Sequence, residues 1–313
     1  IKDRSAILPG GHLSDGSYWF DFQTGTFITS SYYRSSLPAW LTDFNANYPA
    51  DTYLKDWNLL LPSNRYSRTL DDSPYERIIS SKKAPVFPYT REEIGRGNYA
   101  QFVVTPFANT QLTDLATRAI VAEQLGKRNA TDLLCISYSS TDIAGHEFGP
   151  YSLEVEDMYL RLNLELERLF QCLDREVGKK NYVVFLTADH AVVPVPQQLV
   201  DSKLPGGYLD VDSMVTALNQ EWKVKYGEPL VSKCKNLNLY LKRDRIAALG
   251  LDLTMLQEEA ADWMRKQPLV RSVISAYQLD HGNAMSNWDK MLAKGYTKER
   301  SGDVLFMLKP GLI

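Results

Sequence analysis

Two pairs of acidic and imidazole side chains could together bind a metal ion. Asp142 and His146 are one helical turn apart, and Asp189 and His190 are neighbours. Carboxylate and imidazole groups together suit zinc or another first-row divalent metal. A lone Asp-x-x-x-His pattern is common on protein surfaces, but here both pairs come shortly after apolar runs. The sequence therefore predicts that these four side chains hold divalent metal.

The apolar runs are expected to be strands that position the two pairs. Residues 132–137 and 182–186 are short and apolar, as buried strands are. Between them, residues 153–173 carry apolar side chains every three or four positions, which predicts an amphipathic helix ended by Gly178. Strand, helix and strand in this order indicate a parallel sheet covered by helices, with ligands beyond the carboxyl ends of its strands. We therefore expect the four side chains to share one rim of that sheet.

Further elements follow from the same kinds of pattern. Gln23-Thr24-Gly25, between two aromatic runs, predicts a hairpin turn. Residues 113–125 predict a helix ended by Gly126. In the later part of the chain we expect helices at 211–226 and 254–266 and strands at 237–242, 270–276 and 300–308.

Composition narrows the class of protein. The chain has 313 residues and a net charge of -3, with 44% hydrophobic and 23% charged residues. These values exclude a disordered chain, a collagen-like fibre and a small disulfide scaffold, and the charge argues against a general nucleic-acid binder. No apolar run approaches the about 20 residues of a membrane-spanning helix. The three cysteines have no close-spaced pair, and we expect them to be buried free thiols.

Other charged groups have ordinary interpretations. Lys2-Asp3-Arg4 is a charge cluster of the kind that is normally a solvated tail. Asp280-His281 is a further possible ligand pair, but no strongly predicted strand precedes it. We expect His12 to be structural.

Several motifs resemble the alkaline phosphatase superfamily, within its type I phosphodiesterase and nucleotide pyrophosphatase group. The most similar branch is that of the bacterial phosphate-irrepressible alkaline phosphatases with a catalytic threonine. The resemblance runs from end to end of the chain and rests on Lys2–Gly11, Ser139–Pro150, Leu186–His190 and Arg300–Val304.

The resemblance implies a two-zinc site that hydrolyses phosphate monoesters through a covalent phosphoryl-enzyme. Asp142 and His146 match ligands of one zinc, and Asp189 and His190 match ligands of the other. Lys2 and Arg4 match a basic pair that contacts the phosphoryl group. The nucleophile and one further ligand of each zinc have no match, so we expect a core fragment, truncated at both ends, that is inactive alone.

The resemblance also implies an organisation and a location. The fold is expected to be α/β, with a mostly parallel central sheet covered by helices on both faces. Residues 1–198 and 282–313 would form this core, including an aromatic-rich cap over about 12–100, and residues 199–281 a small α+β subdomain. Small phosphate esters are the expected substrates, and the parent protein is expected to be periplasmic or secreted.

Two alternatives stay open. A phosphodiesterase or nucleotide pyrophosphatase of the same superfamily would use the same residues. A non-catalytic binding module that has kept the fold would lack the nucleophile. The ligand types also fit manganese or iron.

Overall fold

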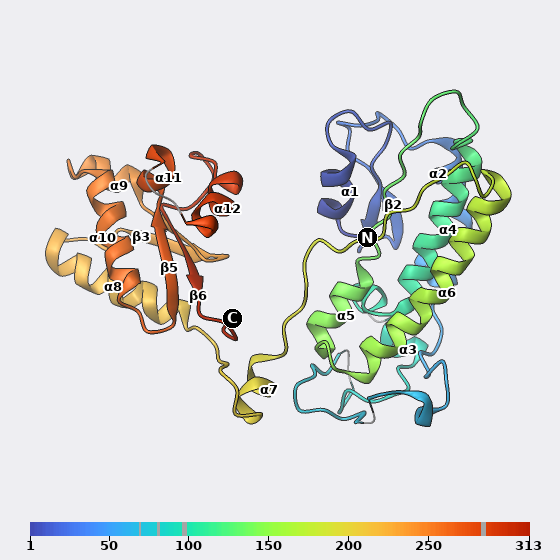
Figure 1. Ribbon diagram of the computed structural model, residues 1–313, viewed down its shortest axis with the longest axis horizontal. Helices are drawn as coiled ribbons and strands as arrows, with labels where there is room; N and C mark the ends of the chain where they lie inside the picture. Colours follow the sequence, from blue (N-terminus) through green and yellow to red (C-terminus); the bar gives the residue numbers. More distant parts are fainter. Residues whose placement is uncertain (69, 80–81, 96–98, 283–285) are drawn as a thin grey trace. The chain divides into compact units, whose positions relative to one another are not determined.

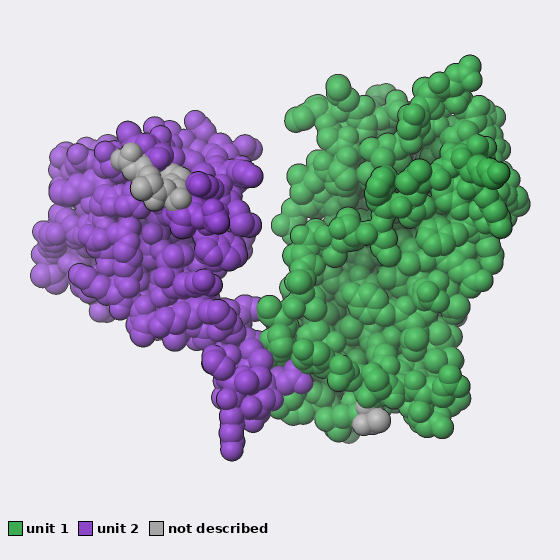
Figure 2. Space-filling model, viewed as in Figure 1, with its two compact units in different colours: residues 1–195 green, residues 196–313 purple. Residues whose placement is uncertain are grey.

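The protein divides into two compact units. The computed structural model describes residues 1–68, 70–79, 82–95, 99–282 and 286–313. Unit 1 comprises Ile1–Val195 and unit 2 comprises Pro196–Ile313, as Figure 2 shows in two colours. Each unit has its own hydrophobic core, so each is described by itself.

Two long helices form the frame of unit 1. α4 spans Pro106–Ala122 and α6 spans Leu153–Glu176, and the two run side by side (Figure 1). Pro106 suits the first turn of α4, where its missing N–H would have no partner in any case. The Ser152 hydroxyl caps α6 by accepting the Val155 N–H at 3.2 Å. Both predicted helices are confirmed, with α4 beginning earlier than expected.

An aromatic-rich region packs against this frame. The predicted turn joins β1 (Trp19–Asp21) to β2 (Thr26–Ile28) in an antiparallel hairpin. Phe20, Trp57 and Tyr89 are buried in its core, and many of its rings meet edge to face, the favoured aromatic geometry. The remaining helical elements are α1 (Asp3–Gly10), α2 (Ala39–Asn47), η1 (Ala50–Thr52), η2 (Ser63–Arg65), α3 (Arg91–Ile94), η3 (Phe102–Val104) and α5 (Ser140–Phe148).

A buried carboxylate on α6 ties the loops of this region to the frame. Asp157 is fully buried and accepts hydrogen bonds from Trp57 Nε1 at 2.7 Å and from the Leu60 N–H at 2.7 Å. The Tyr66 hydroxyl at 2.5 Å and Arg161 Nε at 2.6 Å complete the set. Four donors, one of them a cation, satisfy a carboxylate that would otherwise be costly to bury.

The two segments expected to be buried strands are not buried. Residues 132–137 and 182–186 are irregular, and Leu133 and Phe185 are 83% and 89% exposed. The prediction of a parallel strand pair is therefore wrong for the described residues, where every pairing between named strands is antiparallel. An apolar run shows that a segment suits burial, but pairing also needs neighbouring strands, which the described residues do not supply.

Unit 2 is built on a four-stranded antiparallel sheet of order β3-β4-β6-β5. The strands are β3 (Val231–Lys235), β4 (Asn238–Leu241), β5 (Val270–Ser275) and β6 (Val304–Leu308). The helices are α7 (Pro196–Asp201), α8 (Val211–Tyr226), α9 (Arg243–Ala248), α10 (Leu253–Arg265), α11 (Ala276–His281) and α12 (Asn287–Gly295). The predictions of α8, α10, β4 and β5 are confirmed. The last predicted strand is confirmed only over β6.

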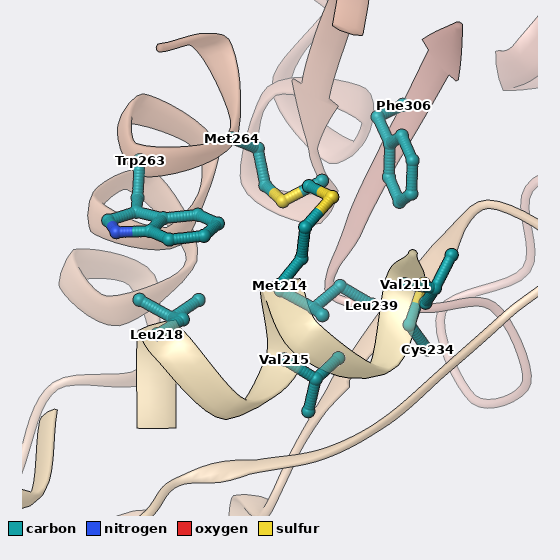
Figure 3. Close-up of a pocket in the computed structure, with 9 residues that line it drawn as sticks. All are labelled: Val211, Met214, Val215, Leu218, Cys234, Leu239, Trp263, Met264 and Phe306. Carbon is teal, nitrogen blue, oxygen red and sulfur yellow. The ribbon is translucent and has the colours of Figure 1, made fainter. Parts of the chain in front are cut away.

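Apolar side chains from helices and strands meet inside unit 2. In Figure 3, Met214 of α8 and Met264 of α10 lie between Trp263 and Phe306. The space that these side chains leave is about 10 Å³, which is barely enough for one water molecule. It is therefore part of the packed core and not a ligand site.

The observed division differs from the predicted domain boundaries in its last segment. Residues 282–313 were expected to return to the first domain, but β6 lies between β4 and β5 and belongs to unit 2. Its neighbour Asp303 is buried and accepts from the Leu241 N–H, Arg243 Nε and Gln257 Nε2 at 2.8–2.9 Å. These bonds hold the start of β6 within unit 2.

Among the described residues, no helix is both long and apolar enough to cross a membrane. The three thiols are free. Cys172 is buried and Cys234 half-buried, but Cys135 is exposed because it lies in the unpaired 132–137 segment, contrary to the expectation for that residue.

Candidate functional site

The first acid–imidazole pair lies on the outer face of α5. Ala144 and Phe148 are fully buried on one face of this helix. Asp142 and His146, one turn apart, project together from another face, as residues i and i+4 do. Gly149 ends α5 with a φ of 79°, a left-handed conformation that glycine adopts readily.

The four predicted ligands come together, though not equally. Asp142 Oδ1 lies 3.4 Å from His146 Nε2 and 3.7 Å from His190 Nε2. His190 Nε2 lies 3.7 Å from Asp189 Oδ2, so the second pair joins the first through its imidazole. The sequence expectation that both pairs reach one place is therefore met for three of these side chains, with Asp189 at the edge.

Lys2 completes this group from the residue before α1. Its Nζ forms an ion pair with Asp142 Oδ2 and donates a hydrogen bond to it. Partial burial raises the pKa of the Asp142 carboxyl, but the hydrogen bond and charge of Lys2 outweigh this effect and lower the pKa overall. Asp142 is therefore an anion at neutral pH. This contact joins residues 140 positions apart, and the local sequence patterns gave no signal of it.

The imidazoles remain accessible. The side chain of His146 is 70% exposed and that of His190 is 55% exposed. His190 Nδ1 lies 3.0 Å from the Ala191 carbonyl oxygen, and this hydrogen bond raises the pKa of His190, helped by the negative charge of Asp189. A hydrogen bond at Nδ1 leaves Nε2 facing Asp142 and available to a ligand.

The donor types fit a divalent metal, but the side chains touch one another instead of enclosing a common point. Asp142, His146, Asp189 and His190 provide the carboxylate oxygen and imidazole nitrogen that zinc prefers. No group of three or more such residues within the described ranges is arranged to hold an ion, and the Lys2 ammonium neutralises Asp142. Metal binding at this place would require Lys2 to release Asp142.

The other predicted residues lie apart from this contact network. Arg4 is exposed on the first turn of α1, where its backbone N–H donates to Asp3 Oδ1 at 2.7 Å. His12 interacts with the Tyr32 hydroxyl, in keeping with a structural role. His281 belongs to α11 in unit 2 and contacts the Tyr277 carbonyl oxygen. An open groove of about 420 Å³ beside α6, lined by residues such as Arg68 and Tyr159, contains none of the predicted site residues.

Comparison with known families matches residues 5–313 to the type I phosphodiesterase / nucleotide pyrophosphatase family. The chain therefore belongs to this family of hydrolases, within the alkaline phosphatase superfamily.

Within that family the chain is similar to proteins named as alkaline phosphatases. It is 38% identical to "Alkaline phosphatase PhoV" of Synechococcus elongatus over 99% of this chain and 56% of that protein. It is also 38% identical to "Alkaline phosphatase PafA" of Elizabethkingia meningoseptica over 100% of this chain and 58% of that protein. The crystal structure of wild-type PafA superimposes with a TM-score of 0.91 at 37% identity, covering 100% of this chain and 60% of that one. The α/β fold expected from the resemblance is thus confirmed, and the chain spans less than three fifths of the length of these two relatives.

Proposed function

We propose that Lys2, Arg4, Asp142, His146, Asp189 and His190 belong to the catalytic site of a metal-dependent phosphatase that hydrolyses phosphate monoesters. The observation that supports this proposal is the meeting of Lys2 with the acid–imidazole pairs at one exposed place. The names of the relatives support the same reaction class.

The basic residues would bind the phosphoryl group. An ammonium is a compact charge for a phosphoryl oxygen, and a guanidinium matches two such oxygens with its planar fork. Lys2 pairs with Asp142 in this structure and would exchange that carboxylate for the substrate. Arg4, two residues after Lys2, is exposed, and its guanidinium would approach the substrate from solvent.

Asp142, His146, Asp189 and His190 would hold the metal, for which zinc is proposed from the donor types. When bound, a pair of divalent ions supplies charge stabilisation to the attacking and departing oxygens of a phosphoryl transfer. The hydrogen bond from His190 to the Ala191 carbonyl would fix the ring so that Nε2 faces the metal.

The first experiment measures metal binding independently of turnover. Zinc is titrated calorimetrically into the 313-residue chain and into His146→Asn, with His281→Asn as the matched control in unit 2. We expect binding to weaken at least tenfold in His146→Asn and to be unchanged in His281→Asn. Equal zinc affinity in all three proteins would contradict the assignment of the ligands.

The second experiment tests the reaction with the full-length protein that contains these 313 residues. Aryl phosphate monoesters and diesters are compared with and without chelator. Chelator-sensitive turnover that favours monoesters supports the proposal. Equal or better diester turnover supports the alternative phosphodiesterase, which the name of the family favours. Zinc binding without turnover of either ester would support a binding module.

A further inference from the structure

Two acidic side chains in unit 1 each bury one carboxylate oxygen for which the described residues supply no donor. Glu154, in the first turn of α6, is fully buried, and its Oε1 accepts the Tyr89 hydroxyl at 2.6 Å. Within the described ranges its Oε2 has no hydrogen-bond partner, and neither has the buried Oε2 of Glu76, a residue that is half-buried as a whole. A buried carboxylate oxygen without a donor is costly, whereas a protonated carboxyl needs fewer donors because it carries no charge.

The charges around this pair are mostly negative. Asp71, Asp72 and Asp157 act on one or both carboxyls as like charges. Asp157 is neutralised by Arg161, but no lysine or arginine within the described part of the chain pairs with Glu76 or Glu154. Lys82, which lies 4.8 Å from the centre of the Tyr89 ring, donates to the Pro88 carbonyl and pairs with Glu93 instead.

The pKa values agree with this environment. Burial raises the pKa of Glu154 from 4.5 to about 7, although the Tyr89 hydroxyl and the backbone N–H of its own residue act in the opposite direction. Burial and the nearby Glu154 raise the pKa of Glu76 from 4.5 to about 8. Both carboxyls thus differ from those of an unfolded chain, which are ionised at neutral pH.

The segment that carries Glu76 also holds α5. The Arg77 N–H donates to the Glu147 carbonyl oxygen at 2.8 Å, and Arg77 Nη1 lies 3.8 Å from Glu147 Oε2. Glu147 follows His146 directly, near the C-terminal end of α5. Residues 73–77 therefore link the Glu76 carboxyl to the helix that carries Asp142 and His146.

We propose that Glu76 and Glu154 keep at least one proton between them while unit 1 is folded, and that its loss in alkaline solution loosens the hold of residues 73–77 on α5. The contact between residues 73–77 and α5 is then sensitive to pH. Neither carboxyl is a proposed metal ligand or takes part in the proposed reaction.

The sign of the effect follows from linkage. A carboxyl whose pKa is raised in the folded state stabilises the fold below the unfolded pKa, and this stability is lost as the pH rises through the folded pKa. As the pH rises from about 5 to about 7, the folding equilibrium constant falls about tenfold per pH unit for each proton that the folded state retains and the unfolded state has lost. Above about pH 8 both carboxyls are ionised, and the curve levels off.

The test compares the chain with Glu76→Gln and Glu154→Gln, whose amides are neutral at every pH. Glu156→Gln is the matched control, because Glu156 also lies on the first turn of α6 but has the opposite pKa shift. Burial raises the pKa of Glu156, but hydrogen bonds from the backbone N–H groups of Ser67 and Arg68 outweigh this effect and lower the pKa overall. Unfolding of unit 1 is followed between pH 5 and pH 9 by hydrogen exchange of peptides that contain Arg77 and the start of α6. Infrared spectra at pH 7 are compared for the carbonyl stretch of a protonated carboxylic acid.

We expect the Glu76 and Glu154 variants to lose about a tenfold dependence per pH unit and to show a weaker acid band than the unchanged chain and the control. Parallel pH curves for all four proteins, or no acid band in the unchanged chain at pH 7, would overturn the proposal. If Glu154→Gln does not fold, Glu76→Gln and the infrared spectrum of the unchanged chain decide the outcome by the same criteria.

Discussion

Replacing Asp157 by asparagine should destabilise unit 1 more than any change of one charged surface group. The two oxygens of Asp157 divide its four donors. Oδ1 accepts from Leu60 N and the Tyr66 hydroxyl, whereas Oδ2 accepts from Trp57 Nε1 and Arg161 Nε. Asparagine can keep only one of these oxygens, and it places an NH₂ group against the donors of the other.

The magnitude follows from those donors. If the remaining oxygen keeps Leu60 and Tyr66, the buried Trp57 N–H loses its acceptor, which costs about 1–3 kcal/mol. Arg161 would also lose its hydrogen bond to Asp157. Its side chain is 20% exposed and keeps a second hydrogen bond to the Asn58 carbonyl oxygen, so water can partly replace the lost acceptor and the cost is about 1 kcal/mol. We therefore expect a loss of about 3 kcal/mol in the free energy of unfolding of unit 1. Tyr66→Phe removes one donor to Asp157 and the hydroxyl that accepts the Leu61 N–H at 3.1 Å, and it should cost about 1–2 kcal/mol.

The assay is urea unfolding followed by hydrogen exchange of peptides from unit 1, because the six tryptophans are spread over both units. Asp43→Asn is the control, since Asp43 forms an exposed ion pair with Arg118 that contributes about 0–1 kcal/mol. The reasoning fails if Asp157→Asn and Asp43→Asn cost the same, because buried donors would then have found other acceptors.

Three further predictions concern other parts of the chain. Asp303→Asn should destabilise unit 2 by about 3 kcal/mol, since it removes an acceptor shared by buried donors, and exchange of unit 1 peptides should not change. A thiol reagent should label Cys135 rapidly and Cys234 slowly, because burial raises the pKa of Cys234 to about 11; a fast phase that survives in Cys135→Ser would contradict this. The protection factor of the Ser67 amide should fall in acid, because the stability that the Glu156 carboxylate gives is lost as the pH falls through its lowered pKa. An unchanged protection factor at Ser67 in acid would count against this link.

Local patterns were sufficient for the hairpin and for α4, α6, α8 and α10, but not for shorter helices such as α2 and α12. α6 has regularly spaced apolar residues and a capping serine, and α8 begins after Asp210, whose side chain accepts the Ser213 N–H at 3.0 Å. Such signals lie within one turn of the residues that they position. The 132–137 and 182–186 segments show the opposite case, since an apolar run says nothing of whether strands are present to pair with it.

The candidate site was predictable in part for the same reason. The spacing of Asp142 and His146 is a property of one helix, but the ion pair with Lys2 depends on how distant segments pack. The buried acids of α6 were missed because a polar side chain is expected to face solvent. A polar stripe along α6 recurs every three or four positions and comprises Glu154, Asp157, Arg161 and Glu165. This regular spacing is the sequence feature that indicates a second face of α6 packed against other parts of the chain.

The exposure of residues 132–137 and 182–186 has a practical consequence for work with this chain. Short uncharged apolar runs, such as Leu133–Ile136 and Tyr182–Leu186, are the segments from which intermolecular β-structure grows. Lys179 and Lys180 stand just before the second run, where like charges oppose stacking of copies. Solubility should therefore fall with rising salt, as screening removes that repulsion, and dilute solutions of low ionic strength suit preparation of these 313 residues.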